Sequence, residues 1–239
     1  MGANDERVLS YGDVLLRKSD VSLLDGPHFL NDHIIEFYFN YLDRQICSFA
    51  GCQEDETSPL LLVGPTPTFW LLHCPDAEGI IATIQPMKLL KRELVIFAVN
   101  NNEDVETAEG GTHWTLLSYN RQKNTFEHFD SMAGTNWKQA RDLVNIVKPY
   151  MGPFAASAKF IEQATPQQEN SYDCGVYVMA IAQLICNAFC ERRKGRPVDY
   201  GGLIRTTVTP STVSKMRYTT IELIHSLANG EESNGDSED

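Results

Sequence analysis

The sequence of 239 residues predicts an α+β fold. Segments typical of helices and of strands interleave along the chain, without the regular strand–helix–strand rhythm of a parallel sheet. The run Leu94–Val99 is entirely apolar, which is typical of a strand with both faces buried. Two strand-like segments, 114–119 and 125–130, flank a polar turn and predict a hairpin. The very apolar segment from Cys174 to about Arg192 predicts a buried helix.

The other elements follow from local signals along the chain. Residues 9–24 mix strand and turn signals, and Asp25-Gly26-Pro27 predicts a turn. Asn31 or Asp32 is a suitable cap for an amphipathic helix, whose apolar face is Ile34, Ile35, Phe37, Tyr38 and Tyr41. We further expect a loop over 47–58, short helices over 68–73 and 76–84, a helix over 137–151, a strand over 159–163 and a final helix over 211–227.

Domain boundaries follow from composition. Residues 9–228 are expected to form a single domain, preceded by a flexible N-terminus over 1–8. Residues 229–239 are rich in acidic and small polar residues and predict a disordered acidic tail. The six cysteines are scattered, which favours free thiols over a disulfide framework. No paired Cys-x-x-Cys or His-x-x-x-His set is present, so we expect neither a metal nor another cofactor.

Charge and hydropathy narrow the range of partners. The net charge is −12, which argues against nucleic acid and favours a basic protein partner. The uninterrupted apolar runs are short, so no membrane-spanning segment is expected. The N-terminus lacks the basic and apolar regions of a signal peptide. We therefore expect the protein in the cytoplasm, the nucleus or both. A monomer is the default expectation.

Four residues could form an activated thiol site. Cys174 begins the apolar helix, where the positive end of the helix dipole favours a thiolate. His113 starts the hairpin and Asp130 ends it, so antiparallel pairing would make their side chains neighbours. The carboxylate would then fix one imidazole tautomer and leave the other ring nitrogen facing Cys174. The amide of Gln168 could stabilise an oxyanion.

Each of these residues also has a purely structural interpretation. A cysteine at a helix start can be a small buried hydrophobe, a histidine before a tryptophan can be a packing residue, and an aspartate at a strand end can form a turn. Their combination favours catalysis, since packing does not require all of them together. Gly175, next to the cysteine, would let a substrate approach the backbone.

The same residues carry a resemblance to a known family. The order His, Asp, Gln, Cys, with Gly-Thr-His-Trp, a hairpin and Asp-Cys-Gly, resembles the sentrin/SUMO-specific cysteine proteases, which cleave ubiquitin-like modifiers. The closest similarity is to the deneddylase branch, which acts on the neddylation modifier (RUB). It extends over about residues 8–228 and rests on Leu9-Ser10-Tyr11, Ser19–Leu24, Phe29–Ile35, Gly110–Trp114 and Pro166-Gln167-Gln168.

The resemblance implies a fold and a reaction. The fold would be that of a papain-like cysteine protease in permuted order (His, Asp, Cys), with a mixed central sheet and the nucleophile at a helix N-terminus. Cys174 would be the nucleophile, His113 the general base and Asp130 its orienting carboxylate. Gln168 and the Cys174 N–H would form the oxyanion hole. The reaction would be cleavage after the C-terminal Gly-Gly of the modifier, in precursor processing and in deconjugation from proteins such as cullins.

Three substrate-binding residues are also implied. Trp114 resembles one wall of a narrow tunnel that admits only a Gly-Gly tail. The family usually has a second tryptophan opposite, where this chain has Phe29. Asp32 resembles a residue that reads the modifier's tail, and its carboxylate would suit a basic residue upstream of the glycines. A plain helix cap is the alternative interpretation of Asp32.

Three alternative functions remain at this point. A SUMO-specific protease would use the same chemistry on another modifier, although that branch often carries long N-terminal extensions. An acyltransferase would pass the acyl group to an amine instead of water. A catalytically inactive binding module is the third, and the intact Cys174, His113, Asp130 and Gln168 argue against it.

Overall fold

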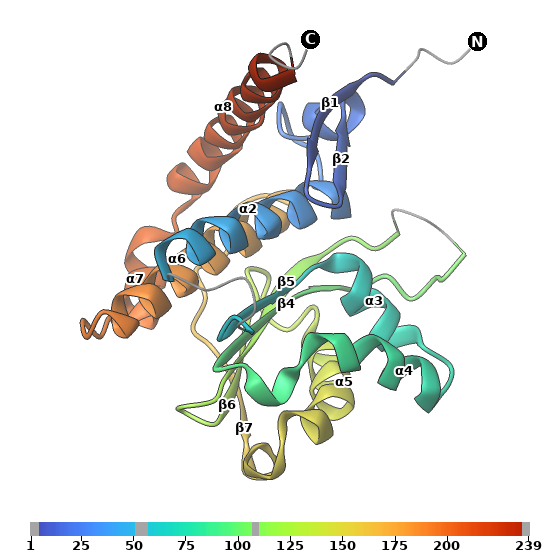
Figure 1. Cartoon of the computed structure of the whole chain (residues 1–239), viewed down its shortest axis with the longest axis vertical. Helices are drawn as coiled ribbons and strands as arrows, with labels where there is room; N and C mark the ends of the chain where they lie inside the picture. The colour runs from blue at the N-terminus through green and yellow to red at the C-terminus, as the bar shows by residue number, and fades with distance from the viewer. Residues whose placement is uncertain (1–4, 51–56, 107–109, 236–239) are drawn as a thin grey trace.

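A five-stranded mixed sheet lies at the centre of the fold (Figure 1). This computed structural model describes residues 5–50, 57–106 and 110–235. The two outer strand pairs are parallel and the two inner pairs are antiparallel, which confirms the predicted mixed sheet. In sheet order the strands are β3 (Leu60–Val63), β4 (Leu94–Asn100), β5 (Trp114–Asn120), β6 (Thr125–Phe129) and β7 (Lys159–Glu162).

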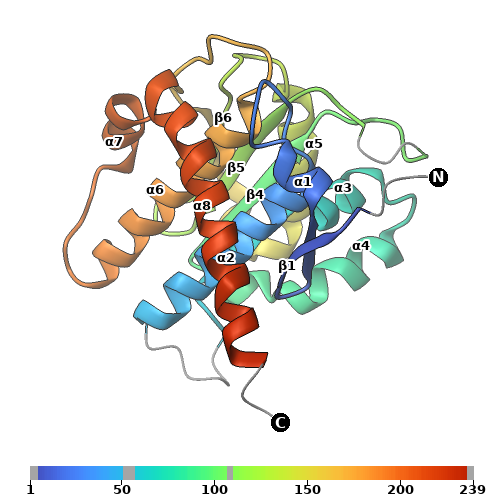
Figure 2. The same cartoon turned by 90° about the horizontal axis from the view of Figure 1, so that it is seen from above.

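Helices cover both faces of this sheet (Figures 1 and 2). One face packs against α2 (Asp32–Ala50) and α6 (Cys174–Arg193), with α7 (Tyr200–Thr207) and α8 (Pro210–Gly235) further out. The other face packs against α3 (Pro65–His73), α4 (Ala77–Ile84) and α5 (Trp137–Val147). Beside α8 lie the small hairpin β1 (Arg7–Tyr11) and β2 (Val14–Arg17), followed by α1 (Lys18–Ser22). Four short 3-10 turns complete the fold: η1 (Gln85–Met87), η2 (Leu89–Lys91), η3 (Lys148–Met151) and η4 (Pro153–Ser157).

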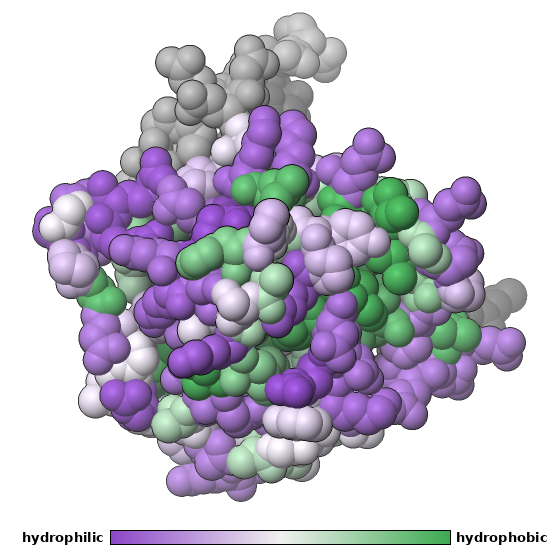
Figure 3. Space-filling view, turned by 90° about the horizontal axis from the view of Figure 1, so that it is seen from below, coloured by the Kyte–Doolittle hydropathy of each residue, from purple (hydrophilic) through white to green (hydrophobic). Residues whose placement is uncertain are grey.

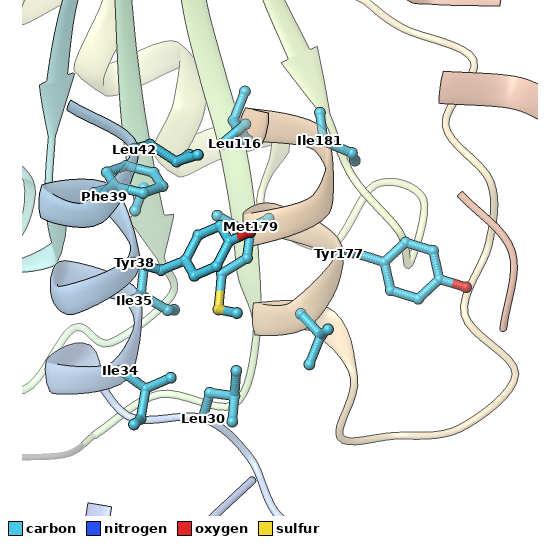
Figure 4. Packing of buried hydrophobic residues seen from close by; sticks show 14 of the residues in the cluster. Leu30, Ile34, Ile35, Tyr38, Phe39, Leu42, Leu116, Tyr177, Met179 and Ile181 are labelled. Carbon is cyan, nitrogen blue, oxygen red and sulfur yellow. The ribbon is translucent and has the colours of Figure 1, made fainter. Parts of the chain in front are cut away.

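Strand β4 contributes side chains to two hydrophobic cores, one on each face of the sheet. Its side chains alternate between the faces, as the two-residue period of a strand requires. Ile96 and Ala98 enter the core formed with α2 and α6, whereas Val95 and Phe97 enter the core formed with α3 and α5. In the first core, Figure 4 shows Tyr38 of α2 and Met179 of α6 in the space between the two helices. Cys174 belongs to this core and has no exposed surface.

Helix α6 differs from the expectation that no segment is long and apolar enough to span a membrane. By length and composition this helix could cross a membrane, contrary to the prediction from short apolar runs. However, 67% of its most apolar 18-residue window is buried inside the protein. A central helix packed between a sheet and other helices must be apolar around most of its circumference, so α6 is apolar because it lies in the core.

The chain ends differ from the predicted boundaries. Strand β1 begins at Arg7, inside the segment expected to be flexible, and residues 1–4 lie outside the described part of the chain. Helix α8 continues to Gly235, into the segment expected to be a disordered tail, of which residues 236–239 lie outside the described part. Helix α2 likewise continues to Ala50 through the start of the predicted loop over 47–58, whose residues 51–56 are not described.

Hydrophobic side chains also occur at the surface. Trp70, Leu90 and Phe154 are each about half exposed or more, at 48%, 65% and 58%. Figure 3 shows one face of the molecule, seen from below the orientation of Figure 1, where hydrophobic residues gather on one side among hydrophilic ones. Such exposure is normal in proteins and we assign it no function.

Glu36 of α2 is a partly buried carboxyl at the start of α3. Its side chain occupies the space beside Gly64, where a Cβ atom would collide with the carboxyl group. Among the described residues its Oε2 atom is buried without a hydrogen-bond partner. Burial, together with smaller contributions from the charges of Asp32 and Asp13, raises the pKa of Glu36 to about 6. The ionised form therefore destabilises the folded state.

We expect Glu36→Gln to stabilise the protein at pH 8 by about 1 kcal/mol, because a shift of one pKa unit corresponds to about 1.4 kcal/mol and partial solvation reduces the effect. The pKa of Glu36 is raised on folding from the ordinary 4.5, so the penalty grows as the pH rises from 4.5 through about 6. Urea unfolding at pH 4.5 and pH 8 measures this penalty as the difference in the free energy of unfolding between Glu36→Gln and the wild type. Glu222→Gln, at an exposed position of α8, is the control. An equal gain at both pH values would contradict the role of ionisation.

Candidate active site

The hairpin brings His113 and Asp130 together. His113 directly precedes β5 and Asp130 directly follows β6, so antiparallel pairing places them at the same end of the hairpin. The Nε2 atom of His113 lies 2.7 Å from Oδ1 of Asp130, and both side chains are 1% exposed. At this distance Nε2–H donates to the carboxylate, which fixes the imidazole tautomer. The structure thus provides the contact that the hairpin predicts.

Backbone N–H groups hold the Asp130 carboxylate from the other side. Oδ1 also accepts from the Met132 N–H at 2.8 Å, and Oδ2 accepts from those of Thr135 and Asn136 at 3.0 and 3.4 Å. Burial opposes ionisation, but the hydrogen bonds from His113 and Met132 outweigh it and lower the pKa of Asp130. The tight turn after β6 therefore orients the carboxylate and stabilises its charge.

Cys174 lies beside the imidazole. Burial alone would lower the pKa of His113, but the hydrogen bond to Asp130 and the adjacent Cys174 thiol raise it to about 9. Among the described residues, the buried Nδ1 atom of His113 has no hydrogen-bond partner. That nitrogen is the one not bonded to Asp130. The arrangement can therefore move a proton between the thiol and Nδ1, with the resulting imidazolium stabilised by Asp130.

The side chain of Gln168 is fixed in orientation. The Ser131 hydroxyl donates to its Oε1 at 2.7 Å, and its Nε2 donates to the Asn170 carbonyl at 2.6 Å. Its backbone N–H also donates to the Ser131 carbonyl at 2.9 Å. An amide nitrogen carries two hydrogens, so one N–H of Gln168 remains for another acceptor. Ser131, which follows Asp130 directly, is a residue that the sequence interpretation missed.

His113 is among the residues that line a cleft of about 490 Å³. Phe29, Asp32 and Trp114 all line it, so the structure brings three of the four residues predicted to bind substrate to one cavity. Trp114 is buried and its Nε1–H donates to the Leu30 carbonyl at 2.9 Å. Phe29 is 44% exposed. The lining also includes Asn100, Asn102, Val105, Glu106 and the segment 110–112.

Gly175 does not line this cleft. A Cβ atom at Gly175 would lie 3.0 Å from Leu30 Cβ and 3.4 Å from Ile35 Cδ1. The absence of a side chain thus allows α6 to pack closely against the segment that begins α2. The structure places this residue in the protein core, beside Leu30 and Ile35, and its predicted contact with substrate stays a prediction.

We expect Gly175→Ala to destabilise the protein by about 1–3 kcal/mol, the usual cost of overpacking. It should also lower kcat/KM, because the added methyl group would displace Leu30, whose carbonyl holds Trp114. Thermal unfolding and turnover measure the two effects. Gly230→Ala, where a Cβ atom meets no atom of the described residues within 4 Å, is the control and should lose neither. Wild-type stability of Gly175→Ala would contradict the packing role.

Two asparagines hold the backbone of His113. Asn101 Oδ1 accepts from the His113 N–H at 3.0 Å, and the fully buried Asn136 donates from Nδ2 to the His113 carbonyl at 3.1 Å. The sequence interpretation missed both. Asn136 immediately precedes α5 and would be taken for a helix cap, but its side chain makes no capping bond and points into the core instead. Local sequence carries no signal of that orientation.

The described part of the chain contains no group of three or more His, Cys, Asp or Glu side chains that could hold a metal ion. The site brings together a thiol, an imidazole, a carboxylate and an amide group. They suit nucleophilic attack by sulfur with proton transfer through one imidazole.

The sequence of the chain is similar to those of known proteases. Residues 86–193 match the family model described as the Ulp1 protease family, C-terminal catalytic domain. The chain is 39% identical over 226 residues to NEDD8-specific protease 1 of Arabidopsis thaliana, covering 94% of this chain and 95% of that protein. It is 36% identical over 225 residues to sentrin-specific protease 8 of Mus musculus, covering 94% and 95%.

Solved structures show the same fold. The Ulp1 C-terminal protease domain in complex with SMT3, the yeast ortholog of SUMO, superimposes with a TM-score of 0.62 at 18% identity, covering 95% of this chain and 90% of that one. At this identity the likeness concerns the fold alone. It confirms the predicted papain-like arrangement, in which a mixed sheet is followed by a long helix that begins at the cysteine.

Proposed function

The chain belongs to the Ulp1 protease family, and on that premise we propose that it cleaves after the C-terminal Gly-Gly of the ubiquitin-like modifier NEDD8. Two relatives at 39% and 36% identity over most of the chain are named as a NEDD8-specific protease and as sentrin-specific protease 8. The observation that carries the proposal is the buried contact of 2.7 Å between His113 and Asp130, with Cys174 beside the free ring nitrogen.

In the first half of the reaction, Nδ1 of His113 takes the proton of the Cys174 thiol. The sulfur then attacks the carbonyl carbon of the modifier's last glycine. Gln168 Nε2–H and the Cys174 backbone N–H donate to the oxyanion that forms, each donor being worth about 3 kcal/mol when removed. The C–N bond breaks as the imidazolium returns its proton to the leaving amine, and a thioester remains on Cys174.

In the second half, water replaces the amine. His113 removes a proton from the water as the oxygen attacks the thioester carbonyl. The C–S bond breaks, the proton passes to Cys174, and the modifier leaves with a free C-terminal carboxylate. Throughout, Asp130 keeps Nε2 protonated and stabilises each imidazolium, which its four hydrogen bonds prepare it to do.

The cleft suits a tail without side chains. Two consecutive glycines can pass between Trp114 and Phe29, where a larger residue would meet an aromatic ring. Phenylalanine in place of the second tryptophan keeps the apolar wall and loses the indole N–H. Asp32, on the same cleft, would pair with a basic residue upstream of the glycines.

The wider role is part of the same proposal. The substrates are the NEDD8 precursor and NEDD8 conjugates, with cullins as the conjugated proteins. The enzyme acts as a monomer in the cytoplasm, the nucleus or both, and needs neither a cofactor nor nucleic acid. The net charge of −12 supports a preference for basic protein surfaces.

Covalent capture tests the proposal. The protein is incubated with NEDD8, SUMO and ubiquitin, each carrying a thiol-reactive C-terminus, and adducts are detected by mass. We expect an adduct with NEDD8 that is absent in Cys174→Ala. An adduct with SUMO alone would retain the chemistry and change the modifier. No adduct with any of the three would contradict the proposed function and favour another acyl donor, as in an acyltransferase.

A further inference from the structure

Arg217 of α8 lies outside the candidate active site but forms hydrogen bonds with two segments that lead into it. Its side chain is buried, although it is charged at every physiological pH. Nε donates to Asp173 Oδ1 at 2.7 Å, Nη1 to the Leu23 carbonyl at 2.9 Å, and Nη2 to the His28 and Tyr172 carbonyls at 2.9 and 3.0 Å. A single guanidinium therefore binds two segments that lie far apart in the sequence.

The first segment carries the aromatic wall of the cleft. Arg217 holds the His28 carbonyl, and Trp114 holds the Leu30 carbonyl at 2.9 Å. Phe29 lies between these two anchored residues and lines the cleft. The backbone on each side of Phe29 is thus fixed by a separate donor.

The second segment leads into the candidate nucleophile. Tyr172 and Asp173 immediately precede Cys174, and Arg217 binds both. Asp173 stands at the cap position of α6, but its side chain makes no capping bond. Its carboxylate pairs with Arg217 through Oδ1 and accepts from the Asn170 side chain at 2.8 Å through Oδ2.

We propose that Arg217 is a positioning residue that fixes the distance between the aromatic wall at Phe29 and the thiol of Cys174. This inference rests on the proposed function, since the wall matters only if a substrate tail passes along it. Arg217 does not line the cleft, so it acts through the groups that accept its hydrogen bonds. These are the backbone carbonyls of Leu23, His28 and Tyr172 and the side chain of Asp173.

Arginine is required here because of its shape. The planar guanidinium carries five N–H donors in a fixed fork, and in Arg217 four of the bonds point to two different segments. Lysine has its donors on one nitrogen atom. It could keep the ion pair with Asp173, but it could not span to the Leu23 and His28 carbonyls at the same time.

Arg121 offers a matched control in the same protein. Its side chain also donates to three backbone carbonyls, those of Arg92, Met151 and Leu89, at 2.6–2.9 Å. These contacts join the hairpin turn to η2 and η3, and none of these residues lines the cleft. Arg121→Lys should therefore lose a similar set of bonds without affecting the cleft.

The test compares Arg217→Lys with Arg121→Lys at a temperature well below the unfolding transition of both. With a NEDD8 C-terminal conjugate as substrate, we expect Arg217→Lys to raise KM about tenfold and to leave kcat within about twofold, because the wall loosens while the pair with Asp173 persists. Arg121→Lys should change neither. Equal KM values for Arg217→Lys and Arg121→Lys would overturn the proposal that Arg217 positions the aromatic wall at Phe29.

A second variant tests the position of the thiol. In Arg217→Met/Asp173→Asn no buried charge is left unpaired, and Cys174 loses its anchored approach. We expect kcat/KM to fall about 100-fold, as for a misplacement of about 1 Å. The rate at which iodoacetamide alkylates Cys174, followed by peptide mass, should fall as well. An alkylation rate equal to that of Arg121→Lys would overturn the proposal for the thiol.

The outcomes separate this inference from the proposed function. A wild-type protein that neither cleaves nor captures any of the three modifiers would contradict the proposed function and, with it, the role of the wall. The alkylation rates would still decide whether Arg217 positions Cys174. A wild-type enzyme with full activity whose Arg217 variants match Arg121→Lys would contradict this inference alone.

Discussion

Cys174→Ala is expected to abolish hydrolysis of NEDD8 conjugates, with a loss of about 10⁵-fold or more, because removal of the nucleophile stops a covalent mechanism outright. Binding of the modifier should persist. Cys174 has no exposed surface and belongs to the core formed by α2 and α6, whereas the cleft is lined by Trp114, Phe29 and Asp32. Release of a fluorophore from the modifier's C-terminus measures turnover, and calorimetry measures binding.

Cys186 provides the control for this experiment. It lies on the same helix, is also fully buried, and burial raises the pKa of its thiol, so it should be unreactive. Cys186→Ala should retain turnover, with some loss of stability from the cavity it leaves. Residual hydrolysis in Cys174→Ala above the level of a blank would exclude Cys174 as the nucleophile.

Asp130→Asn is expected to lower kcat by up to about 10⁴-fold, as in other catalytic triads. The amide can replace the carboxylate in only two ways. If its NH₂ group faces His113, Nε2 must become an acceptor and the wrong tautomer results. If its oxygen faces His113, the NH₂ group meets the N–H donors of Thr135 and Asn136. Steady-state kinetics measure the loss.

The pH dependence of this variant separates a catalytic from a structural effect. In the wild type the pKa of His113 is raised to about 9. Above this pH the imidazolium that holds the proton taken from Cys174, and that must protonate the leaving amine, is lost, so kcat/KM should decline as the pH rises through about 9. The substitution weakens the largest contribution that raises the pKa of His113, its hydrogen bond with Asp130, and also removes the smaller contribution of the Asp130 charge. The alkaline decline should therefore move to lower pH in Asp130→Asn, and an unchanged decline would contradict the assignment.

The pair of His113 and Asp130 also makes the free energy of unfolding depend on pH. The raised pKa of His113 stabilises the fold fully below 6.5, and this contribution is lost as the pH rises through about 9. The lowered pKa of Asp130 stabilises the fold above 3.8, and this contribution is lost at lower pH. Urea unfolding should show the largest difference between wild type and Asp130→Asn between about pH 4 and 6.5. Asp142→Asn, at a half-exposed carboxylate on α5, should show almost none.

The sequence itself predicted the elements whose signals are local. The apolar run of β4, the polar turn between β5 and β6 and the apolar helix from Cys174 each follow from a period or a composition within a few residues. The pairing of His113 with Asp130 could also be predicted, because a hairpin brings its two ends together whatever the rest of the chain does. The family followed from the same motifs.

The tertiary structure decided everything that depends on contacts between distant segments. Gly175 is needed for packing against Leu30, Asn136 turns into the core to hold the His113 carbonyl, and Arg217 joins two segments from the far end of the chain. None of these contacts has a period or a local motif. A buried polar group needs hydrogen-bond partners, and the folded chain supplies these from segments that are distant in the sequence. The role of such a residue is therefore determined by the tertiary structure and not by its neighbours in sequence.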